Sequence, residues 1–223
     1  MFILDKANTH TYMDNLILNE QGNPINTFTI EKTEQEYAHK YIEPNDVVLE
    51  LGARYGSVSV VINKKLSDPT QQIVVEPDDR VWEVLTENRD RNDCKFHIIE
   101  GFISKTNHKL TNLQDCLNGY ASTAIPAETS TIPSYDLEEL QVQYKMNFNV
   151  LVADCEGFLE TFLDQYPFLY DQLRLIMFEA DYPEKCDYTK IKNILQRKAL
   201  NFLTKKIKKE RFQVVKVFDE CSD

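Results

Sequence analysis

Four apolar segments of this sequence each end in an acidic residue. The acids are Glu50, Glu76, Asp154 and Glu179, and each follows a run rich in valine, leucine or isoleucine. Such runs are typical of strands buried in a parallel sheet, whose carboxyl ends line the crevice where ligands bind. Carboxylates in that place can hold a cation, accept hydrogen bonds from hydroxyl groups or take up a proton. The pattern therefore predicts a ligand site at one edge of an α/β sheet.

A glycine turn follows the first of these acids. Gly52 comes directly after the strand, and a new apolar segment begins after Gly56, as in a strand that turns sharply into a helix. Gly52 can adopt backbone angles closed to other residues and admit a ligand close to the main chain, while the start of the helix offers free N–H groups. Nicotinamide-binding folds carry G-x-G-x-x-G here, but Ala53 and Arg54 stand where its middle glycine would be. This departure disfavours a dinucleotide.

Glu50 and Glu76 are placed for a ligand that carries both an amine and a ribose. A carboxylate at the end of a strand can hold an ammonium group directly or through water, which points to S-adenosylmethionine. Glu76 ends the second strand roughly 20 residues after Gly52, the interval at which a carboxylate meets ribose hydroxyls. Taken singly, each acid also fits a position beside a helix cap, and the turn fits any α/β protein. Together they favour a ligand that contains a nucleoside.

The third strand leads to an expected adenine site, and a polar stretch follows it. Residues 95–100 precede Gly101 and Phe102, whose backbone and apolar ring are suited to sandwich an adenine. We expect His97, inside this strand, to be structural. Residues 105–135 are polar and poorly patterned, as in functional or disordered segments. Within them, residues 119–123 form a candidate substrate loop.

Two acids separated by one residue follow the fourth strand. Asp154 is the first candidate for a catalytic base or a substrate-orienting acid, with Glu156 and Glu179 supporting it. Carboxylates that converge at strand ends repel one another unless they are neutralised, so these three residues are also candidate ligands of Mg²⁺ or a similar hard cation. In the alternative interpretation, Asp154 acts as a lone base, and Glu156 with Gly157 only begins the next helix.

The segments between the acids predict one doubly wound, mostly parallel sheet with helices on both faces. Apolar residues at helical spacing predict helices at 33–42, after Gly56, after Pro77, after Gly157 and from 188 to 202. A last strand is expected at 212–217, while residues 199–206 fit either a helix or a strand. We expect residues 1–29 to form a cap or lid and residues 30–223 to form the ligand-binding domain.

The composition fits one soluble domain. The chain has 223 residues, of which 42% are hydrophobic and 27% charged. Its formal net charge of −11 disfavours tracking of phosphates, so we expect no nucleic-acid partner. The five cysteines are scattered without C-x-x-C spacing, which favours a reducing compartment. The sequence shows neither an apolar stretch of membrane-spanning length nor a signal-peptide pattern, and we expect a cytoplasmic protein.

These segments together resemble the FkbM family of S-adenosylmethionine-dependent methyltransferases. The similarity runs from about Tyr41 to Val217, with residues 132–140 resembling the short segment that the family has ahead of its fourth strand. Its specific parts are Glu50-Leu51-Gly52, Glu76-Pro77 and Asp154-Cys155-Glu156-Gly157. The family has the class I methyltransferase fold, which is Rossmann-like, with a seven-stranded sheet. In this chain Arg54 and Tyr55 replace the usual small or amide residues of the turn, and Cys155 is unusual between the two acids.

The resemblance implies O-methylation of a hydroxyl group on a sugar, a glycan or a similar small molecule. The residues expected to contact S-adenosylmethionine are Glu50, Gly52, Arg54, Tyr55, Gly56, Glu76, Pro77, Gly101, Phe102 and Asp154. We expect the aromatic rings of Tyr55, Tyr120 and Tyr182 near the mouth of the site, where they could stack on a sugar face. No Asn-Pro-Pro-Tyr type motif follows the fourth strand, which disfavours methylation of an amino group.

Three other functions compete with this one. An RNA 2′-O-methyltransferase uses the same fold with a Lys-Asp-Lys-Glu arrangement; Lys185 could supply one lysine, but no matching partner stands out, and the net charge is wrong for RNA. A degenerate methyltransferase-fold domain that only binds a partner is disfavoured by the acids retained at the strand ends. An NAD-linked oxidoreductase is disfavoured by the missing middle glycine.

Overall fold

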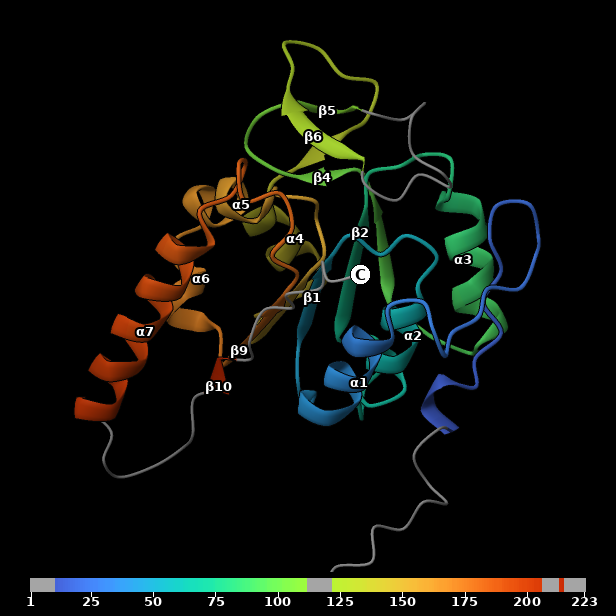
Figure 1. Cartoon of the computed structure of the whole chain (residues 1–223), viewed down its shortest axis with the longest axis horizontal. Helices are drawn as coiled ribbons and strands as arrows, with labels where there is room; N and C mark the ends of the chain where they lie inside the picture. The colour runs from blue at the N-terminus through green and yellow to red at the C-terminus, as the bar shows by residue number, and fades with distance from the viewer. Residues whose placement is uncertain (1–10, 112–121, 206–212, 215–223) are drawn as a thin grey trace, which may run out of the picture.

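A parallel sheet of six strands forms the centre of the structure (Figure 1). The computed structural model describes residues 11–111, 122–205 and 213–214. The central strands are β1 (Val48–Leu51), β2 (Gln72–Glu76), β3 (His97–Glu100), β8 (Val150–Ala153), β9 (Leu175–Phe178) and β10 (Gln213–Val214). They lie in the order β10-β9-β8-β1-β2-β3, and every neighbouring pair is parallel. Counted along the chain, this is the 3-2-1-4-5-6 order of a doubly wound α/β fold, which confirms the predicted fold class.

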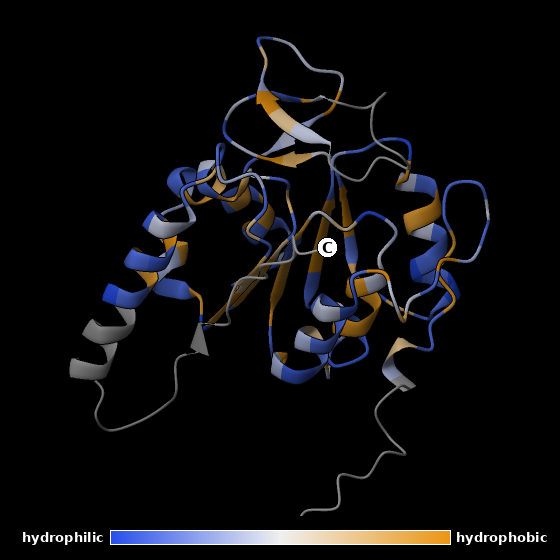
Figure 2. Cartoon of the chain, viewed as in Figure 1, coloured by the Kyte–Doolittle hydropathy of each residue, from blue (hydrophilic) through white to orange (hydrophobic). Residues whose placement is uncertain are grey.

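Helices cover both faces of this sheet. They are α1 (Lys32–Tyr41), α2 (Ser57–Asn63), α3 (Trp82–Arg91), α4 (Leu137–Tyr144), α5 (Leu159–Gln165), α6 (Leu169–Gln172) and α7 (Tyr188–Lys205), after a short 3₁₀ helix, η1 (Thr11–Met13). Side chains alternate along a strand, so Leu49 packs with α4 to α7, whereas Val48 packs with α1 and α2. Figure 2 shows the central strands as apolar along most of their length. The same alternation turns Glu50 toward α2, on the face of Val48.

The sheet differs from the expectation in its strand count. Seven strands were expected from the family resemblance, and the described residues form six central strands. The last expected strand is present as the short β10. Residues 199–205 prolong α7, which settles the choice between helix and strand for that part of the chain. Among the described residues, no helix combines the length and the apolar character needed to cross a membrane.

The polar stretch after β3 forms two small sheets. Strand β4 (Phe102–Ile103) pairs with β7 (Ser134–Tyr135) in parallel, and β5 (His108–Thr111) pairs with β6 (Thr123–Pro126) in an antiparallel hairpin. In Figure 1 they lie at the top, beyond the end of the central sheet from which β3 leads into β4. The expected substrate loop falls on this hairpin. Of that loop, residues 119–121 lie outside the described residues, Tyr120 among them.

The segment before α1 packs against the turn after β1. Ile17 is fully buried in a core cluster with Val60 and Leu85. The amide of Asn88 accepts from Leu18 N–H at 2.9 Å and donates to the carbonyls of Leu18 and Tyr55 at 2.8 and 2.9 Å. These contacts fix the path by which this segment, the expected cap or lid, reaches the carboxyl ends of the central strands. Whether it opens and closes stays a prediction.

Candidate functional site

The turns after β1 and β8 meet at a contact that only glycine allows. Gly52 has a φ of +82°, and a Cβ added there would lie 1.7 Å from the carbonyl oxygen of Asp154. The close approach of the neighbouring turn is therefore the main reason that residue 52 must be glycine. The space that this glycine leaves for a ligand is a secondary effect. Arg54 and Gly56, with φ of +45° and +84°, complete the sharp turn into α2.

A pocket opens at this junction, and we call it the main pocket. It encloses about 750 Å³ of space, of which part is the open mouth. Apolar side chains such as Val75, Phe102 and Phe158 form its walls, and the hairpin β5–β6 adds Leu110, Ser122 and Ala124. Its acidic lining consists of Glu31, Glu76, Asp154 and Glu156. A pocket that combines apolar walls with carboxylates suits a flat base joined to a polyol.

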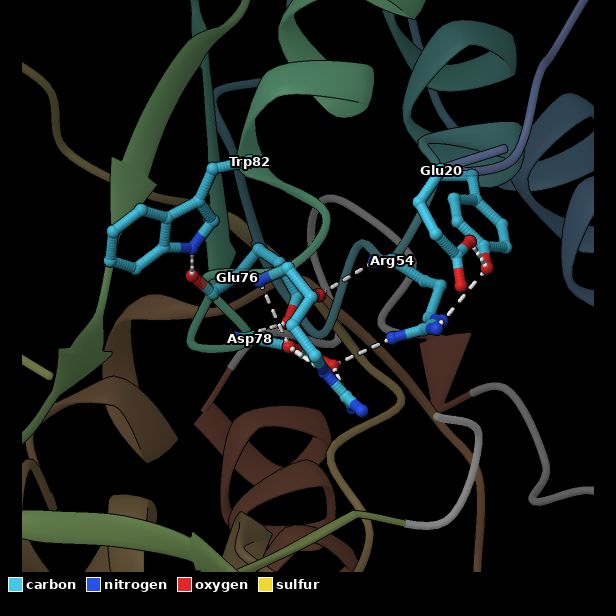
Figure 3. A network of polar contacts seen from close by, with 7 residues as sticks. Glu20, Arg54, Glu76, Asp78 and Trp82 are labelled. Carbon is cyan, nitrogen blue, oxygen red and sulfur yellow. Dashed lines mark hydrogen bonds and ion pairs between the residues drawn. The ribbon is translucent and has the colours of Figure 1, made fainter. Parts of the chain in front are cut away.

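Glu76 is held by the backbone of two turns (Figure 3). One carboxylate oxygen accepts from Arg54 N–H at 2.7 Å and the other from Asp78 N–H at 2.8 Å. The indole N–H of Trp82 donates to the Glu76 carbonyl at 2.7 Å. A carboxylate has about four acceptor positions, so roughly two remain for a ligand in the pocket. Burial raises the pKa of Glu76, while the two backbone donors and the charge of Arg54 oppose that rise.

Asp78 belongs to the same network and forms ion pairs with two arginines. This carboxylate, buried to 1% exposure, lies 2.8 Å from the guanidinium of Arg54 and also pairs with Arg80 at 2.6 Å. Asp78 precedes α3 without capping it, because that helix begins at Trp82, and the Asp78 carboxylate pairs with the two arginines. These arginines hold the pKa of Asp78 below its ordinary value in spite of its burial.

Tyr55 and Gly56 lie away from the site to which they were assigned. The Tyr55 ring is 2% exposed, packs in a core cluster, and donates its hydroxyl to Glu20. Figure 3 shows Glu20 beside Arg54, on the side of the turn remote from Trp82. Neither Tyr55 nor Gly56 lines a pocket at the strand ends. The expected stacking of Tyr55 on a sugar is therefore wrong, because the left-handed backbone at Arg54 directs the next side chain into the core.

A second cavity adjoins the main pocket, and we call it the acidic pocket. Its lining contains five carboxylates, and none of its lining residues is lysine, arginine or histidine. The five are Glu31, Glu34, Glu50, Asp154 and Glu179. Three residues line both cavities, namely Glu31, Gly52 and Asp154. Such a lining favours a ligand group with positive charge.

Neutral donors position Glu50 in this pocket. Its side chain is 2% exposed and accepts from Ser59 Oγ at 2.9 Å and from Gln72 Nε2 at 3.0 Å. The amide of Asn63 donates to Gln72 at 2.9 Å and fixes its orientation. Because burial outweighs these hydrogen bonds, the pKa of Glu50 rises to about 8.

Three carboxylates beyond β8 and β9 come close enough to share one cation. They are Asp154, Glu156 and Asp181, each offering an oxygen within 4.8 Å of the others. Oδ1 of Asp154 and Oδ2 of Asp181 are buried and have no hydrogen-bond partner among the described residues. The predicted trio contained Glu179 in place of Asp181. That choice is corrected, because the chain turns after β9 and brings Asp181 to the cluster, whereas Glu179 faces the acidic pocket and hydrogen-bonds to Asp154.

Asp154 lies at the junction with a second carboxylate, Glu179, close to it. Burial raises its pKa well above the ordinary range, and the charge of Glu179 with the hydrogen bond between them raises it further. A carboxylate in such surroundings binds a proton more strongly than an exposed one. In its ionised form Asp154 is therefore a stronger base than an exposed carboxylate and is suited to accept a proton from a ligand hydroxyl.

Most of the predicted site residues converge on these two cavities. The main pocket collects Gly52, Arg54, Glu76, Pro77, Gly101, Phe102, Asp154 and Glu156, and the acidic pocket collects Glu50, Gly52, Asp154 and Glu179. Sequence reasoning missed Glu31 and the pocket residues of the hairpin. The hairpin carried a weak signal, since Ser122 lies in the proposed substrate loop. Glu31 carried none, because an acid just before a helix resembles an ordinary cap.

Glu50→Gln should flatten the pH dependence of stability. Unfolded Glu50 loses its proton near its ordinary pKa of 4.5, whereas folded Glu50 keeps it to about 8, so the free energy of unfolding falls as pH rises between these values. Glutamine removes the charge, and its Oε1 can accept from Gln72 while its Nε2 donates to Ser59 Oγ. We expect the variant to gain roughly 1–3 kcal/mol over the parent at pH 8 and little at pH 5. Urea unfolding at the two pH values measures these free energies, with exposed Glu36→Gln as the control. An equal change of the free energy of unfolding with pH in the parent and in Glu50→Gln would contradict the prediction.

No protein-family model matches the sequence, and no curated protein matches it. Similar solved structures include the O-methyltransferase from Bacillus cereus in complex with SAH (14% identity, 68% of this chain and 56% of that chain covered, TM-score 0.40). Others are precorrin-6y C5,15-methyltransferase from Geobacter metallireducens GS-15 (13%, 76% and 69%, 0.45) and the M. jannaschii tRNA m1G37 methyltransferase (15%, 76% and 41%, 0.40). The chain thus spans about half the length of the first and less of the third. At such low identities and TM-scores these likenesses carry no argument about activity, and the doubly wound α/β fold rests on the strand order of this chain.

Proposed function

We propose that the chain is an S-adenosylmethionine-dependent methyltransferase that acts on a hydroxyl group. The observation that carries this proposal is the pair of cavities that join at Gly52 and Asp154. One has apolar walls and a carboxylate with free acceptor positions, and the other is lined by five carboxylates without a basic residue. A nucleoside at one end and a cationic amino-acid group at the other match this division. The site lies at the switch point between β1 and β8, where doubly wound folds bind ligands.

The main pocket suits the adenosine part of the donor. Glu76 can accept from both ribose hydroxyls, because its carboxylate is already oriented by two backbone N–H groups. Phe102 and Phe158 line the same cavity and offer apolar surface to the base. Gly101 and Pro77, which we expect to contact the donor, also line this cavity.

The acidic pocket suits the amino-acid part. Glu50 offers a carboxylate to its ammonium group, and an arriving positive charge favours the ionised form of Glu50. When bound, S-adenosylmethionine supplies a methyl group on a positively charged sulfur. The described residues around both cavities contribute binding, orientation and proton transfer. Holding the two reactants together in line is the largest contribution expected of such a site, roughly 7–11 kcal/mol.

Asp154 is the proposed base. It lines both cavities, so it lies at their junction, and one of its buried oxygens has no partner among the described residues. A hydroxyl is a poor nucleophile at neutral pH, and a carboxylate of raised pKa can remove its proton as the new bond forms. Glu179 and Glu156 flank Asp154 and raise its pKa through their charges.

We propose a carbohydrate hydroxyl, free or within a glycan, as the acceptor. The FkbM resemblance and the net charge of −11, which disfavours nucleic acid, support this class. Of the three tyrosines expected near the mouth, Tyr55 is buried, Tyr120 lies outside the described residues, and Tyr182 follows Asp181 of the cation cluster. Only Tyr182 therefore remains as a described candidate for stacking on a sugar.

A hard cation is a second element of the proposal. Asp154, Glu156 and Asp181 present carboxylate oxygens, the ligands that Mg²⁺ prefers, and two of the oxygens are buried without partners among the described residues. The residues therefore fit such an ion. Bound there, it would neutralise repulsion and help to orient an acceptor hydroxyl.

Donor binding is the first test of the proposed function. S-adenosylmethionine or its demethylated product at a hundredfold excess over the dissociation constant should stabilise the chain by about 2.7 kcal/mol. Glu76→Ala should lose most of this shift, because the ribose acceptor is gone, whereas exposed Glu83→Ala on the neighbouring helix α3 should keep it. Thermal melts of the three proteins measure the effect. A parent melt that neither ligand changes would refute donor binding.

Methyl transfer is the second test. Isotopically labelled donor, offered with separate panels of saccharides, RNA and small phenols, should label a saccharide. Asp154→Asn should reduce turnover by about 10²–10⁴-fold with little change in donor affinity, since asparagine cannot take up the proton. Label found in RNA or phenols but in no saccharide would overturn the acceptor class, and unchanged turnover in Asp154→Asn would remove the base.

Chelation separates the cation from the base. If the cluster holds Mg²⁺, turnover should be lost in a chelator and return with added Mg²⁺, and Asp181→Asn should raise the Mg²⁺ concentration needed. Glu184→Gln, an exposed acid near this cluster in the chain, is the matched control. Full activity in the chelated enzyme would eliminate the cation and leave Asp154 as a lone base.

A further inference from the structure

Glu31 is an acid at the junction of the two cavities that the proposed function has not yet fully used. It belongs to the N-terminal segment and directly precedes α1, with a left-handed backbone at φ +47°. Its carboxylate accepts a hydrogen bond from Ser57 at the start of α2. It lines both the main pocket and the acidic pocket, a position that it shares with Gly52 and Asp154 alone among the residues the structure describes.

The surroundings of Glu31 are acidic from every side. The charged and titratable groups of the two cavities are Glu34 and Tyr37 from α1, Glu50 from β1, Arg54 and Glu76 in the main pocket, Asp154, Cys155 and Glu156 after β8, and Glu179 after β9. Among the described residues of this lining, Arg54 is the one cation, and its guanidinium is paired with Asp78. Burial raises the pKa of Glu31 to about 7, and the charges of Glu34, Glu179 and Glu76 add to the rise. A positive charge beside Glu31 reverses that penalty.

We propose that Glu31 determines specificity by making the site bind the positively charged donor more tightly than the product with neutral sulfur. This inference rests on the proposed function. In the transfer, the hydroxyl oxygen bonds to the methyl carbon, the carbon–sulfur electron pair stays on sulfur, and the hydroxyl proton goes to Asp154. The sulfur thereby loses its positive charge. The carboxylates at the junction are then less neutralised, which favours release of the product.

Glu31 is distinguished from the other acids by what it touches. Glu76 is positioned for ribose hydroxyls, which donor and product share, and Glu50 lies only in the acidic pocket, where the ammonium group common to both is expected. Asp154 is the proposed base. Glu31 is the remaining carboxylate that lines both cavities, and glutamine in its place keeps an acceptor for Ser57.

The ratio of the affinities for the donor and for the product tests this inference. Calorimetric titration of the full chain at pH 8 should show S-adenosylmethionine binding more tightly than S-adenosylhomocysteine. Glu31→Gln should weaken the donor by about tenfold while leaving the product within about twofold. Glu36→Gln, an exposed acid on α1 that pairs with Lys32, should change neither affinity. A Glu31→Gln variant that weakens both ligands equally, or neither, would overturn the inference.

The pH dependence of this affinity ratio gives a second test, which can be measured on the parent protein first. Protonation of Glu31 below about pH 7 should reduce the preference for the donor between pH 8 and pH 6. In Glu31→Gln the ratio should change less over the same range. A parent ratio that is constant with pH contradicts the inference while leaving donor binding intact. If the parent binds neither ligand, the proposed function fails and this inference with it.

Discussion

The approach of Gly52 to the carbonyl of Asp154 is the constraint on which the site depends. Gly52 N–H donates to Val75 at 3.0 Å and Asp154 N–H donates to Leu51 at 3.0 Å, so the ends of β2, β1 and β8 are tied together at the switch point. With 1.7 Å between a hypothetical Cβ at residue 52 and the carbonyl, any other residue would force the two turns apart. Both cavities begin at this contact. The close contact keeps the main pocket and the acidic pocket in one fixed relation.

The second constraint is electrostatic. Folding collects several carboxylates at the strand ends and withdraws them from water, which disfavours their ionised forms and raises the pKa of Glu31, Glu50 and Asp154. Neutral hydrogen-bond donors satisfy some of these groups without balancing their charge. Such an arrangement costs stability in the ligand-free chain and is typical of functional sites, where a ligand or ion of opposite sign relieves it.

The sequence was sufficient to place those site residues that lie directly at the end of a strand. Glu50, Glu76 and Asp154 could be placed because a buried strand has a fixed direction and its last residue has a predictable neighbourhood. The place of Tyr55 could not be predicted, because the direction of its side chain depends on the left-handed backbone of Arg54. Asp181 took the expected place of Glu179 because the irregular segment after β9 has no periodicity to read. Glu31 comes from a distant segment, held by Asn88 and other long-range contacts that no local pattern encodes.

The glutamates Glu76 and Glu50 differ in their electrostatic behaviour because their hydrogen-bond partners differ. Glu76 accepts from backbone N–H groups and lies near the guanidinium of Arg54, so positive potential opposes the effect of its burial. Glu50 accepts only from the uncharged side chains of Ser59 and Gln72, and its pKa rises to about 8. A carboxylate of the first kind acts as a steady hydrogen-bond acceptor, which is what ribose hydroxyls require. One of the second kind changes its charge with its ligand, and it therefore responds to a cation and not to a neutral group of the same shape.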